Sequence, residues 1–237
     1  MACDAFCDSG SKIGGSGVVV LPCGAGKTIV GMAVLARMNT HTLILTTGAT
    51  SVHQWKQELI RKTTLNEDDI GEYSGEEKQI KPITISTYQM LTSRRVQGGE
   101  FLHFDIFNAC PWGLIIYDEV HLLPAKVFQF SASVQAVRRL GLTATLIRED
   151  GRETDVFSLI GPKCFDIPWR EIERKGWIAQ TKCTEIRVPL SEQTKMDYAR
   201  AEKRERFRIA AENSIKQEAI SELLQLHVEE SILIIGQ

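Results

Sequence analysis

The sequence predicts an α/β fold with a mostly parallel sheet flanked by helices. Short apolar runs alternate with segments of helical character, which is typical of repeated strand–helix–strand units. Two of these runs, at residues 18–21 and 114–117, are followed at once by short motifs of polar residues and glycine. Because the carboxyl ends of parallel strands meet at one edge of a sheet, we expect both motifs to lie at that edge.

The remaining elements follow from composition and from start and stop signals. Apolar runs rich in β-branched residues predict strands, Pro124 is placed to open a helix, and Ser191 to cap one. We expect strands at 18–21, 42–46, 83–86, 114–117 and 139–143, and β-like structure at 181–188. We expect helices at 29–38, 52–62, 88–95, 124–130 and 191–212, an acidic loop from 63 to 75, and a polar segment at 149–155.

The first motif joins the first strand to the first helix and has the pattern of a phosphate-binding loop. It reads Leu21-Pro22-Cys23-Gly24-Ala25-Gly26-Lys27-Thr28. Gly24 and Gly26 let the backbone curl with its N–H groups pointing inward, at a helix N-terminus that favours anions. Lys27 can reach the β- and γ-phosphates, and the Thr28 hydroxyl can ligate Mg²⁺. The general motif has a glycine six residues before the lysine, where this chain has Leu21.

The second motif places two carboxylates after the strand at 114–117. Asp118 would lie near Thr28 and hold the metal, directly or through water, and Glu119 would polarise the attacking water. An isolated Asp-Glu pair after a strand is usually a solvated turn. Together with a phosphate loop, the pair predicts hydrolysis of a nucleotide.

Charge and composition limit the partners and the cellular location that we expect for the chain. The net charge of −2 gives no overall electrostatic footprint for nucleic acid, although basic residues confined to one groove could still bind it. No run approaches the roughly 18 apolar residues of a membrane span, and residues 1–17 lack the apolar segment of a signal peptide. Six scattered cysteines without metal-ligand spacing fit a reducing cytosol, so we expect a cytoplasmic protein.

The two motifs, about 90 residues apart, resemble the first motor lobe of superfamily 2 helicases, a P-loop NTPase with a RecA-like fold. That superfamily commonly lacks the leading glycine. Further segments narrow the resemblance to the XPB family of DNA helicases, in particular its bacterial branch. They are Asp118-Glu119-Val120-His121-Leu122-Leu123-Pro124-Ala125, Gly141-Leu142-Thr143-Ala144-Thr145, Arg148-Glu149-Asp150, Leu159-Ile160-Gly161-Pro162-Lys163 and Gly176-Trp177-Ile178-Ala179.

The resemblance implies the roles of individual residues. Residues 21–28 would bind ATP, Thr28 and Asp118 the Mg²⁺, and Lys27, Asp118 and Glu119 would be catalytic. The residues implied in coupling nucleotide state to DNA are His121, Thr143, Ala144 and Thr145; the residues implied in DNA contact are Thr47, Gln54, Thr87, Arg148, Glu149 and Asp150.

For several of these residues a purely structural role stays open as an alternative. His121 could be a solvated residue at a strand end, the two threonines ordinary strand caps, and residues 148–150 a charged surface turn. Trp55 fits a core position better than a stacking platform.

The resemblance runs through nearly the whole chain and implies its organisation. We expect an N-terminal remnant at 1–17, the ATP-binding lobe at 18–190, a helical inter-lobe segment at 191–228, and at 229–237 the first strand of a second lobe that the chain lacks. On this interpretation the chain is cut at both ends. The alternative for the last segment is a strand added to the edge of the first sheet.

The predicted function is the ATP-binding lobe of a DNA helicase of the DNA repair type, moving 3′ to 5′ with Mg-ATP hydrolysis. Its partners would be DNA and the second lobe, with no membrane, and the oligomeric state stays unassigned. Alone, the chain should turn ATP over slowly, because arginine fingers of the kind expected on the second lobe are worth roughly 10³–10⁵ in rate. Two alternatives remain: a nucleotide-binding module without activity, and a superfamily 2 motor acting on RNA or in restriction.

Overall fold

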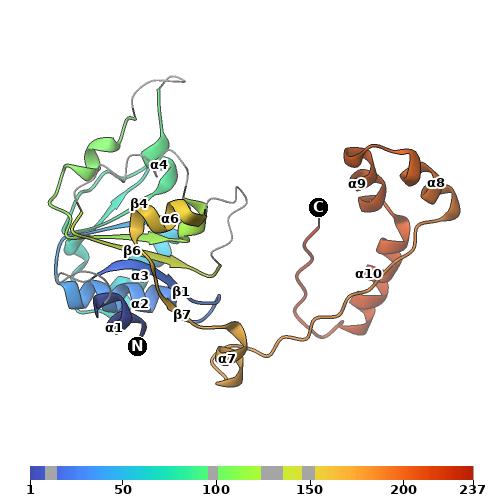
Figure 1. Ribbon diagram of the computed structural model, residues 1–237, viewed down its shortest axis with the longest axis horizontal. Helices are drawn as coiled ribbons and strands as arrows, with labels where there is room; N and C mark the ends of the chain where they lie inside the picture. The colour runs from blue at the N-terminus through green and yellow to red at the C-terminus, as the bar shows by residue number, and fades with distance from the viewer. Residues whose placement is uncertain (9–14, 96–100, 124–135, 146–152, 237) are drawn as a thin grey trace. The chain divides into compact units, whose positions relative to one another are not determined.

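The computed structural model describes residues 1–8, 15–95, 101–123, 136–145 and 153–236 (Figure 1). It divides into two compact units, Met1–Gln180 and Thr181–Gln237, which are described separately. Among the described residues, no helix is long and apolar enough to cross a bilayer.

A seven-stranded sheet forms the centre of the first unit, with the strand order β3-β4-β2-β5-β6-β1-β7. Every neighbouring pair of strands in it is parallel. The strands are β1 (Ser16–Val20), β2 (Thr42–Thr46), β3 (Ile70–Tyr73), β4 (Ile83–Thr87), β5 (Leu114–Asp118), β6 (Arg138–Thr143) and β7 (Lys163–Asp166). The predicted α/β class with a parallel sheet is confirmed.

Helices cover both faces of this sheet (Figure 1). On one face lie α1 (Ala2–Asp8), α2 (Lys27–Met38) and α3 (Ala49–Lys62); on the other lie α4 (Tyr88–Thr92) and α6 (Glu153–Ile160). The strand residues divide between two apolar cores accordingly: Val19 belongs to the core beneath α1–α3, whereas Val18 and Val20 belong to the other. Because both faces are covered, the strands at the centre of the sheet, such as β2 and β5, are rich in apolar residues.

Short 3₁₀ segments and one further helix complete the first unit. They are η1 (Glu67–Asp69), η2 (Phe104–Phe107), η3 (Val120–Leu122) and α7 (Trp169–Arg174). The segment η3 follows β5 directly, so it continues the second sequence motif at the carboxyl edge of the sheet.

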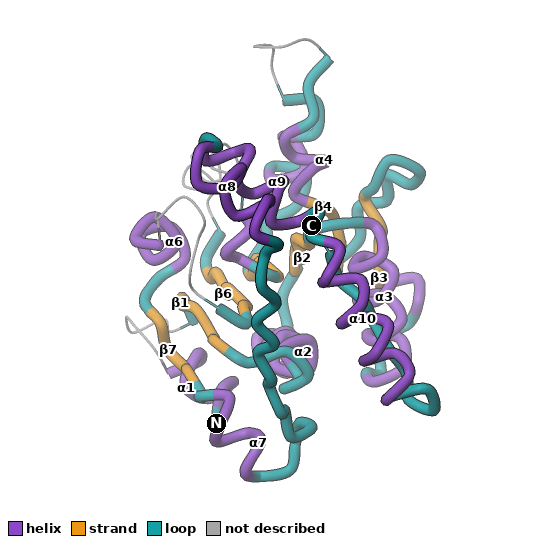
Figure 2. The backbone as a smooth tube through the Cα atoms, turned by 90° about the vertical axis from the view of Figure 1, so that its right-hand side faces the viewer, coloured by secondary structure: helices purple, strands orange, loops and turns teal. Residues whose placement is uncertain are grey.

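The second unit is helical, as Figure 2 shows, with α8 (Glu192–Arg200), α9 (Lys203–Ala211) and α10 (Ser214–Leu226). The hydroxyl of Ser191 caps α8 by accepting a hydrogen bond from the Thr194 N–H, at 3.2 Å. The helix expected at 191–212 is therefore present but interrupted at residues 201–202.

Several expectations about single elements are wrong. The segment 63–75, expected to be a loop, contains β3. Of the polar segment at 149–155, residues 149–152 lie outside the described residues, and α6 begins at Glu153. Four further elements, α1, α6, β7 and α7, had no counterpart in the sequence analysis. Residues 181–188 form no strand, and neither do the described residues 231–236. The helix expected at 124–130 lies outside the described residues.

The absence of a side chain at Gly31 lets α3 and β6 pack closely against α2. A side-chain Cβ placed at Gly31 would lie 2.6 Å from Cη2 of Trp55 and 3.3 Å from Cδ1 of Leu142. Glycine at this position therefore lets the indole of Trp55, which is 2% exposed, pack directly against the backbone of α2.

We predict that Gly31→Ala destabilises the fold by about 1–3 kcal/mol, because the added methyl group collides with the indole. In a Trp55→Phe background the colliding ring atoms are gone, and alanine is favoured over glycine in a helix by about 1 kcal/mol. The same substitution should then cost much less. Urea unfolding of the unmodified chain, the two single variants and the double variant measures this coupling.

The control is Gly75→Ala, since no atom lies within 4 Å of the added Cβ there. An equal loss of unfolding free energy on Gly31→Ala in both backgrounds would contradict the packing account.

Candidate nucleotide-binding site

The loop between β1 and α2 has the backbone shape that its glycines predict. Gly24 and Gly26 adopt φ angles of 77° and 88°, in the left-handed region that favours glycine. The Ala25 N–H donates to the Pro22 carbonyl at 3.1 Å, and the Leu21 N–H donates to the Thr143 carbonyl at 2.9 Å. Because Gly26 is the N-cap of α2 and has no side chain, it cannot cap the first N–H groups of the helix. Such a helix start is suited to binding phosphate.

Lys27 and Glu119 form an ion pair across this edge of the sheet. Lys27 Nζ lies 3.1 Å from Glu119 Oε1, and the two side chains are 12% and 28% exposed. The lysine of the phosphate loop is therefore held beside the carboxylate expected to activate water. A triphosphate that reached Lys27 would compete with Glu119 for the same ammonium group.

Asp118, at the end of β5, is fixed by hydrogen bonds on both sides. Its Oδ2 accepts from Trp55 Nε1 at 2.9 Å, its Oδ1 accepts from the Glu119 N–H at 3.1 Å, and its carbonyl accepts from the Tyr88 hydroxyl at 2.8 Å. Burial raises the pKa of Asp118; the Trp55 hydrogen bond opposes this shift, the Glu119 charge adds to it, and the Lys27 charge opposes it.

Glu119 adopts a strained backbone conformation, with φ 50° and ψ 53°. For a residue other than glycine this conformation costs on the order of 1 kcal/mol or more, and such strain is common at functional sites. Glu119 Oε2 is buried and accepts no hydrogen bond within the part of the chain that the structure describes. The strained backbone thus directs a carboxylate into the site with one oxygen available to accept a proton.

His121 links the second motif to the end of β6. Its Nδ1 lies 2.8 Å from Oγ1 of Thr143 and 3.5 Å from Glu119 Oε2. The Thr143 hydroxyl donates to the Thr145 carbonyl and accepts from the Thr145 N–H. Since the Thr143 hydroxyl donates its one hydrogen to the Thr145 carbonyl, it must accept a hydrogen bond from His121. This assigns the imidazole proton to Nδ1.

A hollow of about 360 Å³ lies between the phosphate loop, α3 and the end of β5. Its lining residues are Cys23, Gly24, Gly26, Lys27, Thr28, Ile29, Ser51, Gln54, Trp55, Glu58, Lys62, Asp118 and Glu119. The Thr28 hydroxyl and the Asp118 carboxylate are oxygen ligands that Mg²⁺ accepts beside phosphate oxygens and water, so this set of donors fits the expected ion. Ala144, which is half-buried, follows Thr143 at the same edge.

The structure separates the residues implied in DNA contact. Thr47 is exposed just after β2, whereas Gln54 lines the nucleotide hollow. Thr87 is 7% exposed, and its hydroxyl caps α4 by accepting from the Met90 N–H at 3.2 Å. Arg148, Glu149 and Asp150 lie outside the described residues. The DNA contacts therefore stay predictions.

Sequence reasoning missed four residues of the hollow, Ile29, Ser51, Glu58 and Lys62, and placed Trp55 in the core without seeing its hydrogen bond to Asp118. The missed signal is helical spacing: residues 51, 55, 58 and 62 of α3 recur at intervals of three and four and so share one face. The indole N–H of a buried tryptophan usually has an acceptor, which could have led from Trp55 to a carboxylate.

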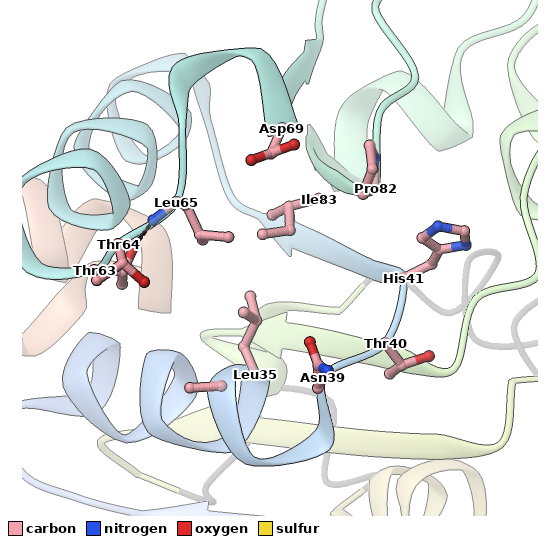
Figure 3. A pocket seen from close by; sticks show the side chains of 11 residues that line it. Leu35, Asn39, Thr40, His41, Thr63, Thr64, Leu65, Asp69, Pro82 and Ile83 are labelled. Atoms are coloured by element: carbon pink, nitrogen blue, oxygen red, sulfur yellow. Dashed lines mark hydrogen bonds between the residues drawn. The ribbon is translucent and has the colours of Figure 1, made fainter.

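A larger hollow, of about 660 Å³, lies at the opposite edge of the sheet, where β2 and β4 begin (Figure 3). Leu35, Leu65 and Ile83 point into it, with Asp69 and His41 at its margin. The Asp69 carboxylate already accepts from the Asn66 N–H, and His41 lies against Cys110. This hollow includes none of the motif residues, so its size does not make it the nucleotide site.

A parallel sheet with a glycine loop entering a helix, and an Asp-Glu pair two strands away at the same edge, is the arrangement of a P-loop NTPase lobe. Residues 1–148 match the family model described as Type III restriction enzyme, res subunit, and the chain belongs to this family. The helicase domain of Hef from Pyrococcus furiosus has the same fold, with a TM-score of 0.56 at 20% identity over 78% of this chain and 41% of that one.

The chain is also a homologue of XPB proteins. It is 56% identical over 223 residues, 94% of this chain, to the DNA 3′-5′ helicase XPB of Mycobacterium tuberculosis, of which it covers 40%. It is 35% identical over 218 residues, 90% of this chain, to the General transcription and DNA repair factor IIH helicase/translocase subunit XPB/SSL2 of Saccharomyces cerevisiae, of which it covers 26%. The resemblance to the XPB family is confirmed, and the chain spans well under half the length of these relatives.

We predict that Asp118 makes the fold less stable as pH rises, and that Asp118→Asn removes this pH dependence. The raised pKa means that folding disfavours the charged carboxylate. The contribution of Asp118 to stability is therefore fully present below its unfolded pKa and is lost as pH rises through the raised pKa, whereas a neutral asparagine has no such dependence. Asparagine has one acceptor oxygen where the carboxylate has two, so the variant loses one of the hydrogen bonds from Trp55 and Glu119 at every pH. Thermal unfolding at several pH values should therefore give a difference in midpoint that shifts in favour of Asp118→Asn as pH rises. A difference in midpoint that stays the same over this pH range would contradict this account.

Proposed function

We propose that this chain is the ATP-binding lobe of an XPB-type DNA helicase, in which hydrolysis of Mg-ATP drives movement along DNA. The observation that carries the proposal is the meeting of Lys27, Asp118 and Glu119 at one edge of the sheet, with a 3.1 Å contact between Lys27 and Glu119. A phosphate-binding lysine, a carboxylate suited to a metal and a second carboxylate beside them are the groups that phosphoryl transfer to water requires.

In this proposal the triphosphate binds along the loop from Gly24 to Thr28. Its negative charge draws Lys27 away from Glu119, because the loop N–H groups and the lysine together neutralise the phosphates. Mg²⁺, held by Thr28 and Asp118, would supply charge neutralisation at the phosphate oxygens. Glu119, released from Lys27, orients a water molecule and accepts its proton as the γ-phosphate is attacked.

His121 and Thr143 connect this chemistry to the end of β6. Their 2.8 Å hydrogen bond lies beside the proton-accepting oxygen of Glu119, so a change at the γ-phosphate reaches β6 through two side chains. We infer that this link, together with Ala144 and Thr145, couples nucleotide state to the grip on DNA.

The partners proposed for the chain rest on its relatives. The bacterial XPB relatives are named as DNA 3′-5′ helicases, and the chain spans about 40% of the one from Mycobacterium tuberculosis. We propose DNA as the substrate, 3′-to-5′ movement, and a second motor lobe in the remainder of such a protein, to which residues 229–237 would lead. The proposed lobe boundaries and a cytoplasmic location also remain proposals.

A restriction-type or RNA-directed motor is the alternative. The matched family model carries a restriction enzyme's name. The XPB proteins are favoured because their match covers 94% of the chain at 56% identity, whereas the family model ends at residue 148. Stimulation of ATP hydrolysis by RNA rather than DNA in the longer protein would favour the alternative.

We predict that the chain binds Mg-ATP and hydrolyses it slowly, and that Glu119→Gln abolishes hydrolysis while leaving binding within about threefold. Glutamine keeps the size of the side chain but cannot accept the proton of water; losses of about 10²–10⁴ in rate follow from removing such a group. Calorimetry measures binding, and phosphate release with and without single-stranded DNA measures turnover.

Lys27→Ala is the matched comparison for this experiment, since it should remove binding itself. Absence of Mg-ATP binding by the unmodified chain, or full activity of Glu119→Gln, would overturn the proposed function. DNA-stimulated hydrolysis at rates of 1 s⁻¹ or more by the unmodified chain, within the range typical of complete enzymes, would contradict the need for a second lobe.

A further inference from the structure

The turn after α7 returns the chain to the phosphate loop. The Trp177 N–H donates to the Ile172 carbonyl at 3.2 Å, and the Gly176 N–H donates to the Glu173 carbonyl at 3.0 Å. Gly176 has a φ angle of 70°. These two bonds around a left-handed glycine form a Schellman motif, which ends the helix in one defined direction. The sequence Gly176-Trp177-Ile178 therefore occupies a fixed turn rather than a free tail.

Ile178 brings this turn against the phosphate loop. Its Cγ2 methyl lies 3.6 Å from the position that a Cβ would take at Gly24, and its side chain packs partly buried against the core beneath α1–α3. The residue just before this anchor, Trp177, is thereby held close to the loop.

Trp177 itself is left 68% exposed. The Lys175 ammonium lies 5.4 Å from the centroid of its ring, within the range of a cation–π contact. A tryptophan is the side chain with the most apolar surface to bury, so an exposed indole on a fixed turn is a candidate for a planar ligand.

In the part of the chain that the structure describes, the nucleotide hollow has groups for phosphate and metal but no exposed aromatic face for a base. Trp55 is the single aromatic residue among those that line it, and this indole is 2% exposed. The base of a nucleotide bound through Lys27 therefore needs a surface outside that hollow, and Trp177 lies next to the loop at Gly24.

We propose that Trp177 forms the nucleobase subsite, stacking its indole on the base of the nucleotide whose phosphates the loop holds, with Lys175 at the edge of the subsite. This inference rests on the proposed function, because it assumes that the loop binds a nucleoside triphosphate. The ligand class is a purine or pyrimidine nucleotide, selected by a flat π face rather than by charge.

The test compares two probes, Mg-ATP and inorganic Mg-tripolyphosphate, by calorimetry on this chain. Trp177→Ala should weaken ATP binding about tenfold, as the loss of one base–aromatic stack predicts, and leave tripolyphosphate binding unchanged. Trp177→Phe should restore most of the ATP affinity. Trp169→Ala is the matched control: Trp169 is 41% exposed at the start of α7, and its loss should change neither ligand.

Other outcomes would overturn the proposal in distinguishable ways. ATP affinity unchanged in Trp177→Ala, or equal weakening of both probes, would overturn the base subsite and leave the proposed function standing. Failure of the unmodified chain to bind either probe would overturn the proposed function and the inference with it. A matched loss of ATP affinity in Trp169→Ala would count against Trp177 as well, since it would indicate a general effect of α7.

Discussion

The parallel pairing of β6 between β1 and β5 is the constraint on which the site depends. Its register places Thr143 beside Val20, where the phosphate loop begins, and Leu142 beside Asp118, where the carboxylates begin. A shift of one residue would turn every side chain of β6 to the other face of the sheet. The site is thus a consequence of strand register, with residues from three strands brought together at their carboxyl ends.

Each carboxylate of the site has a polar partner. The ammonium of Lys27 is paired with Glu119, and Asp118 is held by the Trp55 indole rather than by a cation. Buried charges are costly unless paired, so this arrangement allows a site with two carboxylates to fold before any ligand arrives. The strained Glu119 backbone is consistent with a residue held in place for chemistry rather than for stability.

Sequence reasoning reached the fold class and most of the residues that line the candidate site, because both depend on local pattern. Sequence alone indicates the strands β2 and β5, because buried strands need continuous apolar runs. It also indicates the glycine loop, because a phosphate loop needs particular residues at fixed spacing. The motif residues from Leu21 to Thr28 could be assigned together with Asp118 and Glu119 for that reason.

What escaped prediction depends on contacts between distant segments. β3 and β7 are short edge strands of four residues each. Their polar composition is typical of a loop, and only their pairing with the neighbouring strand identifies them as strands. The hydrogen bond from Trp55 to Asp118 joins residues 63 positions apart, and only the packing of α3 against the sheet brings them together. The approach of Ile178 to Gly24 is a similar case.

The most direct test of the central claim is a crystal structure of this chain with Mg²⁺ and a non-hydrolysable ATP analogue. The account predicts the triphosphate along residues 24–28, with Lys27 Nζ on a phosphate oxygen, its 3.1 Å contact with Glu119 broken, and the metal at Thr28 and Asp118. An analogue bound elsewhere, such as in the hollow at the opposite edge of the sheet, or bound with the Lys27–Glu119 pair intact, would contradict it.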